Sequence, residues 1–484
     1  MKLRVCMCAM TTAYSLNIGN LGNFGSSKVR SAPKVDVSWE ELESQTEPEL
    51  VLDDFTLLRG PPSALALSRR FGENAEPALK LYRDSASWCP YCQKVWPLLE
   101  EKRVSYDIQK IPMACYGSKP AEFLRDQPSG TLPAAVLNGR VLGSSDGIIA
   151  QVLDLPDGPG AVCDIDARDD PRCRMLLDLE RQHFSAWLRW LTGGETNKQI
   201  FVRTLDAVEN ALAQSKDGPF FLGNRFSFID LMYAPFLERM AASLAYFKGF
   251  IVKGPTPYLS TLSQMDTNLH AYQRYPHLNK WFLAMEQRPS YVATLSDFYT
   301  HAHDLPVQLG GCVRLESQQA DAIRADIDKN AWRHGILPKY EPLTPTHIHG
   351  TLPRLEAAAR LARNGPAVAR FAARGISMPG FPPVRAELAD PNANANESIL
   401  PTIDALLRLI VIRLRTDAPP DKKDTIISEW LATSAQAKER TAAQDAVKCL
   451  SYLRDRVGVP RDMSQPAAFA LRAECNSIID LISS

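Results

Sequence analysis

Residues 78–92 read ALKLYRDSASWCPYC, and they are the strongest indication of the fold of the N-terminal part of the chain. Residues 78–83 have the apolar character of a short buried strand, and the polar residues after them indicate a loop. The CPYC sequence at 89–92 then opens a helical stretch that extends to about Arg103. Proline suits the first position of a helix, because the N–H that it lacks would find no partner there. A strand, a loop and a CxxC at a helix N-terminus are typical of a thioredoxin-like unit.

The residues that follow extend this unit. Residues 104–111 alternate as a second strand, and Asn138-Gly139 lies between two short apolar runs. This dipeptide is the strongest short hairpin signal, because a type I′ turn needs positive φ at both positions. A further helix is predicted from about Asp146 to Leu153. The order strand, helix, strand, helix, hairpin, helix predicts an α/β thioredoxin-like domain over residues 78–156.

The central part of the chain is predicted to be helical. Residues 157–170 are rich in Pro, Gly and Asp and are interpreted as a linker, and apolar residues then recur at helical spacing over 171–305. Ser227 and Asp230 can cap a helix reciprocally, with Phe226 packing onto Leu231 as a hydrophobic staple. We therefore expect an all-α domain here.

The last third of the chain, residues 306–484, is rich in Ala, Arg and Leu. Helical stretches are predicted at 352–363 and 402–414, and they are separated by breakers at 379–383 and 390–396. We interpret this third as a mainly helical extension of unknown role.

The composition excludes several classes of function. The chain has 484 residues, with 55 Lys+Arg against 55 Asp+Glu, so its net charge of +0 gives no reason to expect a nucleic acid partner. The longest apolar run, 407–414, is interrupted by Arg408 and Arg413, and we expect no membrane span. Ten cysteines are too few for a disulfide scaffold and point to a reducing compartment. These features predict a soluble, intracellular, multi-domain protein.

The N-terminus has a different charge from the rest. Residues 1–35 contain five basic residues, scattered Ser and Thr, and no acidic residue. This composition is typical of an organellar transit peptide, which we place at 1–36, followed by an N-terminal extension at 37–77. We expect a plastid location, or otherwise a mitochondrial or cytoplasmic one. A plain disordered tail is the alternative interpretation of the same residues.

The CxxC motif is the part of the sequence that carries chemistry. At a helix N-terminus, Cys89 faces unpaired N–H groups and the positive end of the helix dipole, which favour its thiolate. Cys92 lies one turn later on the same face and can attack a mixed disulfide formed at Cys89. A structural zinc site and a buried structural pair stay open as alternatives, but no second CxxC exists to complete a zinc site. We therefore predict a redox or nucleophilic site without a metal.

Several motifs, in order over residues 78–300, resemble the cysteine-type branch of the glutathione transferase superfamily, with its omega, lambda and iota classes. WCPYCQKVWPLLEEKR at 88–103 resembles the active-site helix of that branch. PFFLGNRFSFIDLMYAPFLE at 219–238 and YPHLNKWFLAMEQRPSY at 275–291 resemble helices of its second domain. The long C-terminal extension, with LRDRVGVPRDMSQPAA at 453–468, resembles the iota class of photosynthetic organisms.

The resemblance implies glutathione as co-substrate and a set of residues that bind it. Lys119 corresponds to the lysine that meets the glycine carboxylate, and the Leu132-Pro133 bond to a cis-proline step whose backbone pairs with the cysteinyl part. Ser145 corresponds to the serine that receives the γ-glutamyl carboxylate, and it can also be the N-cap of its helix. The residues so implied in glutathione binding are Pro90, Tyr91, Lys119, Leu132, Pro133, Ser144 and Ser145.

Two departures from the family pattern have expected consequences. Ser144 stands where the family usually has Glu or Gln, and its shorter side chain is expected to weaken the hold on glutathione. Pro97 falls inside the helix that begins at Cys89, so we predict a bend after Trp96.

These observations favour a glutathione-dependent thiol transferase that reduces mixed disulfides, as glutaredoxins do. Cys89 would be the nucleophile, and bound glutathione or Cys92 would release the product. Glutathionylated proteins or small disulfides are the expected substrates, and a monomer or a homodimer is the expected assembly. The alternative is a non-catalytic platform on a transferase fold, which binds a ligand or another protein.

Overall fold

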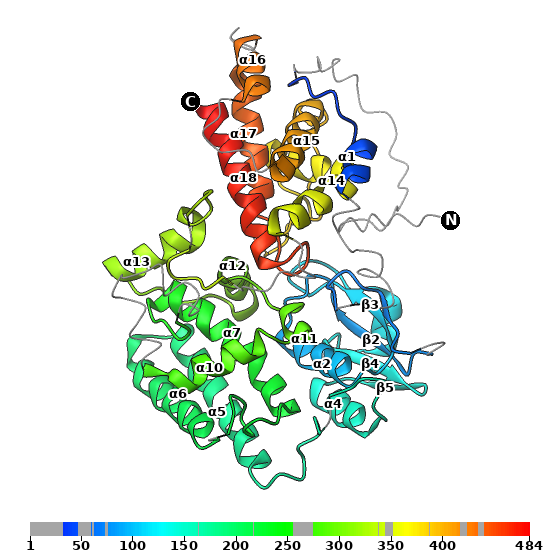
Figure 1. Cartoon of the computed structure of the whole chain (residues 1–484), viewed down its shortest axis with the longest axis vertical. Helices are drawn as coiled ribbons and strands as arrows, with labels where there is room; N and C mark the ends of the chain where they lie inside the picture. Colours follow the sequence, from blue (N-terminus) through cyan, green and yellow to red (C-terminus); the bar gives the residue numbers. More distant parts are fainter. Residues whose placement is uncertain are drawn as a thin grey trace.

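The structure is a computed structural model of the whole chain (Figure 1). It describes residues 32–46, 60, 62–72, 76–162, 164–215, 217–254, 274–336, 338–343, 352–386, 388–416, 424–433 and 440–484. Most of the predicted leader, 1–36, therefore lies outside the described residues.

A five-stranded mixed sheet forms the N-terminal domain, with strand order β1-β3-β2-β4-β5. The strands are β1 (Ser68–Arg69), β2 (Leu79–Asp84), β3 (Tyr106–Ile111), β4 (Ala134–Leu137) and β5 (Arg140–Leu142). β2 and β3 run parallel with Leu81 opposite Ile108, and the other neighbours are antiparallel. Asn138 and Gly139 both have positive φ, as predicted for the β4–β5 hairpin. The predicted thioredoxin-like fold is confirmed, while β1 was not predicted.

The helices of this domain cover both faces of the sheet because side chains alternate along each strand. α2 (Pro90–Glu101) and α4 (Ser145–Asp154) pack with Leu79 and Leu81 of β2 in the main apolar core. Phe123 of α3 (Ala121–Asp126) packs with Tyr82 on the opposite face. α2 includes Pro97 and runs on to Glu101, so the proline does not end the helix; the bend after Trp96 stays a prediction.

A helical domain lies beside the sheet and shares its core (Figure 1). Ser227 and Asp230 form the predicted capping box of the long buried helix α7, which ends at Gly249 with φ of 62°. The elements of this part are α5 (Cys173–Leu191), η2 (Glu195–Asn197), α6 (Lys198–Ala213), α7 (Phe228–Lys248), α10 (Pro276–Met285), α11 (Pro289–Val292) and α12 (Phe298–Leu309).

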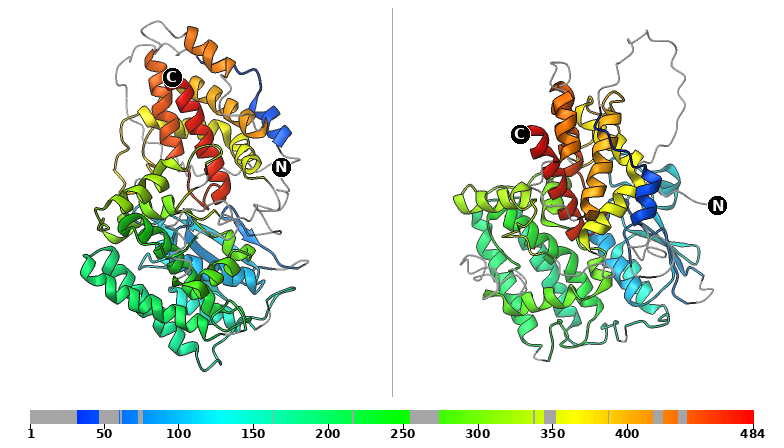
Figure 2. Two further views of the ribbon diagram at one scale, coloured as in Figure 1. Left: turned by 60° about the vertical axis from the view of Figure 1, so that its left-hand side comes forward. Right: turned by 45° about the horizontal axis from the view of Figure 1, so that its top comes forward.

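The helices from Pro353 onward form a separate bundle on top of these two domains, while α13 (Gln318–Ala325) and η3 (Asp326–Asn330) belong to the core of the helical domain (Figures 1 and 2). The bundle's own apolar core joins helices α14, α15, α17 and α18, and α1 near the N-terminus packs against α14 and α15. The elements of the bundle and its surroundings are α1 (Trp39–Thr46), α14 (Pro353–Ala372), η5 (Ala373–Ile376), α15 (Leu400–Thr416), α16 (Thr425–Thr433), α17 (Arg440–Arg454) and α18 (Gln465–Ser483). In the part of the chain that the structure describes, no helix combines the length and apolarity that crossing a membrane requires.

The N-terminal residues 35–46 belong with this bundle rather than with the sheet. Val35 is buried in the bundle core, and Arg408 donates hydrogen bonds to the Val35 and Val37 carbonyls at 2.7 Å each. The Trp39 indole donates to Asp404 at 2.7 Å and packs so closely on Gly365 that a Cβ there would lie 2.3 Å from the ring. No local pattern in the sequence predicts this pairing of two distant parts of the chain.

Candidate active site

The N-terminus of α2 positions the two cysteines of the CxxC motif. Cys89 is the N-cap residue, and its Sγ accepts a hydrogen bond from the Cys92 N–H at 3.4 Å. Pro90 is the first helical residue, where its missing N–H leaves no bond unmade. This geometry matches the predicted placement and turns the partial positive charge of the helix end toward the Cys89 sulfur.

The two thiols have different environments. The side chain of Cys89 is 8% exposed and that of Cys92 only 2%. Burial raises the pKa of Cys92 well above its ordinary value, and Cys89 and the charge of Asp84 raise it further. Cys92 is therefore held as a neutral thiol at neutral pH.

Side chains of the helical domain fix α2 in place. Gln93 donates to the Glu238 carboxylate at 2.8 Å and accepts from the Arg239 guanidinium at 2.8 Å. Arg239 also donates to the carbonyl of Trp88, the residue before Cys89. The side chains of Trp88, Gln93, Glu238 and Arg239 are all buried, so the position of Cys89 depends on contacts with α7.

The remaining predicted glutathione residues fall on two sides of Cys89. The Leu132–Pro133 peptide bond is cis, as predicted, and the Leu132 carbonyl lies 3.8 Å from the Cys89 Sγ. Lys119 is half-buried just before α3 and donates to the Pro112 carbonyl at 3.0 Å. Burial lowers the pKa of Lys119, and the nearby sulfurs of Cys92 and Cys89 act in the opposite direction.

Of the two serines at the start of α4, Ser144 rather than Ser145 caps the helix. Ser144 is the N-cap, and its Oγ accepts from the Gly147 N–H at 3.2 Å. Ser145, the residue expected at the N-cap, is the buried first residue of the helix, and its Oγ donates to Asp146 at 3.4 Å. The short side chain of Ser144 thus serves the helix, because an N-cap needs an oxygen close to its own backbone.

Tyr91 faces the helical domain rather than the sheet. Its half-buried ring meets Phe236 of α7 edge to face, with 5.7 Å between the ring centroids. The structure therefore places Tyr91 on one side of the α2 N-terminus and Lys119, Leu132 and Ser145 on elements of the N-terminal domain.

Asp84 is a residue of this site that the sequence reasoning missed. It ends β2, its side chain is 1% exposed, and its Oδ2 accepts from the Trp88 N–H at 2.6 Å. The available signal was an acidic residue at the end of an apolar strand, directly before the CxxC loop. Such a residue is carried into the interior together with its strand.

The extension reaches this site through Trp88. The Trp88 indole N–H donates to the Val459 carbonyl at 3.2 Å, and the Ser296 hydroxyl donates to the same oxygen. The Arg461 guanidinium lies 5.4 Å from the centre of the indole ring. The loop between α17 and α18 is therefore part of the wall behind Cys89.

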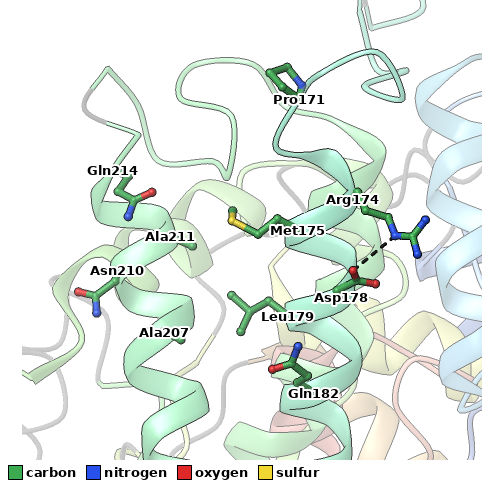
Figure 3. A pocket seen from close by; sticks show the side chains of 10 residues that line it. All are labelled: Pro171, Arg174, Met175, Asp178, Leu179, Gln182, Ala207, Asn210, Ala211 and Gln214. Atoms are coloured by element: carbon green, nitrogen blue, oxygen red, sulfur yellow. Dashed lines mark hydrogen bonds and ion pairs between the residues drawn. The ribbon is translucent and has the colours of Figure 1, made fainter.

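A separate groove of about 770 Å³ lies between α5 and α6 (Figure 3). None of the predicted glutathione residues lines it. Its lining consists of Pro171, Arg174, Met175, Asp178, Leu179, Gln182, Ala207, Asn210, Ala211 and Gln214.

Comparison with protein families agrees with this geometry. Residues 88–153 match the glutathione S-transferase N-terminal domain, and residues 194–284 match the glutathione S-transferase C-terminal domain. These two segments of the chain are therefore glutathione S-transferase domains. Glutathione S-transferases are enzymes that use glutathione as co-substrate. Both matches end before the extension, and the iota class stays a prediction.

Plant proteins are among the relatives of this chain. Protein IN2-1 homolog B of Oryza sativa subsp. indica is 26% identical over 185 residues, which cover 38% of this chain and 75% of the relative. Glutathione S-transferase L1 of Arabidopsis thaliana is 29% identical, covering 37% and 74%. The chloroplastic glutathione S-transferase DHAR3 of Arabidopsis thaliana is 27% identical, covering 36% of this chain and 63% of the relative. These relatives support a glutathione-dependent thiol transferase at the level of the family.

A solved glutathione transferase aligns with part of this chain. Glutathione transferase Omega 3C from Trametes versicolor is 24% identical and covers 46% of this chain and 91% of its own, with a TM-score of 0.35.

Proposed function

We propose that this transferase reduces mixed disulfides of glutathione, with Cys89 as the nucleophile. The observation that carries the proposal is the position of the Cys89 sulfur, which accepts an N–H bond at the N-terminus of α2 beside the cis Leu132–Pro133 bond. A thiolate is the attacking species in disulfide exchange, and a helix N-terminus favours it.

In the first step the Cys89 thiolate attacks the glutathione sulfur of the mixed disulfide. The substrate leaves as a thiolate and takes up a proton from water, and a disulfide between Cys89 and glutathione remains. The thiolate of a second glutathione then attacks the glutathione sulfur in this bond. Oxidised glutathione leaves and the Cys89 thiolate is restored. The second glutathione supplies the electrons, and the substrate sulfur is reduced to a thiol.

We infer a monothiol route, in which Cys92 is not needed for turnover. Cys92 is buried and its pKa is raised, so the thiolate that would attack the Cys89 sulfur is scarce at neutral pH. The thiol of a second glutathione comes from solution, so burial does not raise its pKa. In the dithiol alternative, Cys92 would displace glutathione and form a disulfide with Cys89.

Glutathione has two carboxylates, and the site offers a partner for each. Lys119 would hold the glycine carboxylate as a point charge, and Ser145 with the N–H groups of the α4 N-terminus would hold the γ-glutamyl carboxylate. Leu132 would pair through its backbone with the cysteinyl part, while Pro90, Tyr91, Pro133 and Ser144 would line the same site. The expected plastid location is supported by two chloroplastic relatives, DHAR3 and L2 of Arabidopsis thaliana.

The test compares glutathione-dependent reduction of a small mixed disulfide by the wild type, Cys89→Ser, Cys92→Ser and Cys173→Ser, with a chelator present. We expect Cys89→Ser to lose at least about 100-fold in rate, because a hydroxyl is a far poorer nucleophile than a thiolate. Cys92→Ser is expected to keep most of the rate. Cys173, another buried free cysteine, lies in α5 and is the matched control, expected to match the wild type.

Equal loss in Cys89→Ser and Cys92→Ser would replace the monothiol route by the dithiol one. An inactive wild type that is not retained on immobilised glutathione would contradict the proposed reaction. That result would favour the non-catalytic platform, for which the distinctive extension and Ser144 are the supporting features.

A further inference from the structure

Three side chains that can bind a metal converge behind the N-terminus of α2. They come from the end of β2 (Asp84), the N-cap of α2 (Cys89) and its first turn (Cys92). One ligand atom of each, a carboxylate oxygen and two sulfurs, lies within 4.8 Å of the other two. The sequence offered only the cysteine pair, and folding adds the carboxylate.

Of the two oxygens of the Asp84 carboxylate, one has a hydrogen-bond partner among the described residues and the other has none. Its Oδ2 accepts from the Trp88 N–H, but its buried Oδ1 has no hydrogen-bond partner among the residues that the structure describes. An unpaired carboxylate oxygen in the interior costs free energy, since it has lost water without gaining a partner. A cation bound between this carboxylate and the two sulfurs would supply the missing partner.

The charges around Asp84, Cys89 and Cys92 favour a bound cation over three ionised side chains without one. Two thiolates and a carboxylate this close repel one another strongly where water is excluded. The guanidinium of Arg83 and the ammonium of Lys119 act on the sulfurs, but Arg83 is already bonded to the Ser87 hydroxyl and the Ala64 carbonyl. If both thiols lost their protons, these two positive charges would leave one of the three negative charges uncompensated.

We propose that Asp84, Cys89 and Cys92 bind one Zn²⁺ ion, with a fourth position left for water or an external thiol. Thiolates select Zn²⁺ over Mg²⁺ and Ca²⁺, and three protein ligands plus one open position are a usual zinc arrangement. Zn–S bonds of ~2.3 Å and Zn–O bonds of ~2.0 Å put tetrahedral ligand atoms about 3.5–3.8 Å apart. From separations of at most 4.8 Å, the ligand atoms therefore need to close by at most about 1.3 Å. Binding releases up to two thiol protons to water.

Zinc binding and disulfide reduction would exclude each other. The zinc ion engages the lone pair with which the Cys89 sulfur attacks, so the loaded chain is inactive and a chelator restores it. The zinc proposal uses the same cysteines as the proposed function but does not depend on that reaction.

The experiment measures zinc affinity on the full chain, reduced and freed of metal, by competition with a chromophoric zinc indicator. We expect one Zn²⁺ per chain in the wild type. Removal of one ligand in Asp84→Asn should weaken binding at least about tenfold, and Cys89→Ser and Cys92→Ser should weaken it further. The matched controls are Asp126→Asn, which changes another aspartate bonded to a β2 side chain, and Cys173→Ser; both should bind as the wild type does.

The Asp84→Asn variant should fold, because the new side-chain amide keeps an oxygen for the Trp88 N–H. If it does not fold, X-ray absorption at the zinc edge of the wild-type chain answers the same question, and two sulfurs with oxygen completing the shell are expected. No saturable zinc binding, unchanged affinity in Asp84→Asn, or a shell with four sulfurs or none would overturn the proposal. Zinc binding without reductase activity would contradict only the proposed function. Reductase activity without zinc binding would contradict only the zinc site.

Discussion

The two apolar cores of the molecule differ in the side chains that build them. The core shared by the sheet and the transferase helices is rich in aromatic rings, among them Trp96, Trp187 and Trp281. The core of the extension is aliphatic, with Trp430 as its only buried aromatic residue among those described. Many of its members are alanines, such as Ala357 and Ala358 of α14, which let helices approach closely. The extension is thus a close-packed helical bundle with a core of its own.

The boundary between the two cores is polar, in contrast to both. Arg472 of α18 forms an ion pair with Asp297 at the start of α12, and both side chains are fully buried. Gln465 donates to Glu341 at 2.8 Å, and Val459 receives the bonds from Trp88 and Ser296. Apolar surfaces can slide, whereas directed bonds fix one position. The contrast indicates that the extension is held in a single register against the residue before Cys89.

The largest effect is expected from Arg472→Ala, which removes one partner of the buried ion pair. Asp297 would be left as an unpaired buried charge, and such losses cost about 3–5 kcal/mol in the free energy of unfolding. Denaturant unfolding measures it. Arg333→Ala is the control: Arg333 pairs with Asp480 at 3.4 Å on the surface, and its loss should cost less than about 1 kcal/mol. Equal costs would show that the boundary pair does not hold the extension.

A pair of core truncations tests whether the two cores unfold together. Leu406→Ala in α15 and Leu237→Ala in α7 each remove a fully buried leucine and should each cost about 2–5 kcal/mol. Because directed bonds join the cores, we expect both variants to lower the Tm of one calorimetric transition. Two transitions, each moved by one variant only, would make the extension an independent unit.

The pH dependence of stability probes the boundary through Glu341. Burial and then the charge of Asp297 raise the pKa of Glu341 to about 8, against bonds from Phe298 N–H and Gln465 and the charge of Arg472. The folded chain then binds a proton that the unfolded chain has released, so stability falls as the pH rises from about 4.5 to about 8, by roughly 1 kcal/mol per pH unit.

Glu341→Gln should flatten that slope in unfolding experiments between about pH 5 and pH 8. The control Glu397→Gln changes an exposed glutamate that pairs with Arg370 and should leave the slope as it is. A slope that Glu341→Gln leaves unaltered would contradict a proton at this position of the boundary.

The smallest effect is expected from Trp88→Phe, which keeps an aromatic ring and removes the N–H that reaches Val459. One lost hydrogen bond costs about 1 kcal/mol, and the Val459 carbonyl keeps its bond from Ser296. We expect a lower rate of Cys89 alkylation together with this small loss of stability. Ser296→Ala removes the other donor to the same oxygen and should leave the alkylation rate unchanged. Equal alkylation rates in both variants would show that the contact between Trp88 and the extension does not affect the reactivity of Cys89.

Local patterns predicted the individual elements well. The β4–β5 hairpin followed from Asn138-Gly139, and the start of α7 followed from Ser227 and Asp230, because each signal acts within a few residues. Where two neighbours compete, the same signals fail: Ser144 rather than Ser145 caps α4, since either hydroxyl could begin the helix. β1 has two residues and pairs only with β3, so its own sequence carried almost no signal.

The thioredoxin-like unit, the helical domain and the CxxC at a helix N-terminus could all be predicted from the sequence. These depend on side-chain periodicity and on capping, which are properties of short segments. Three contacts became visible only in the folded chain: Asp84 lies beside the two sulfurs, α1 joins the C-terminal bundle, and Val459 meets Trp88 across 371 positions of the chain. Contacts between distant segments depend on how whole elements pack, and no local pattern encodes that packing.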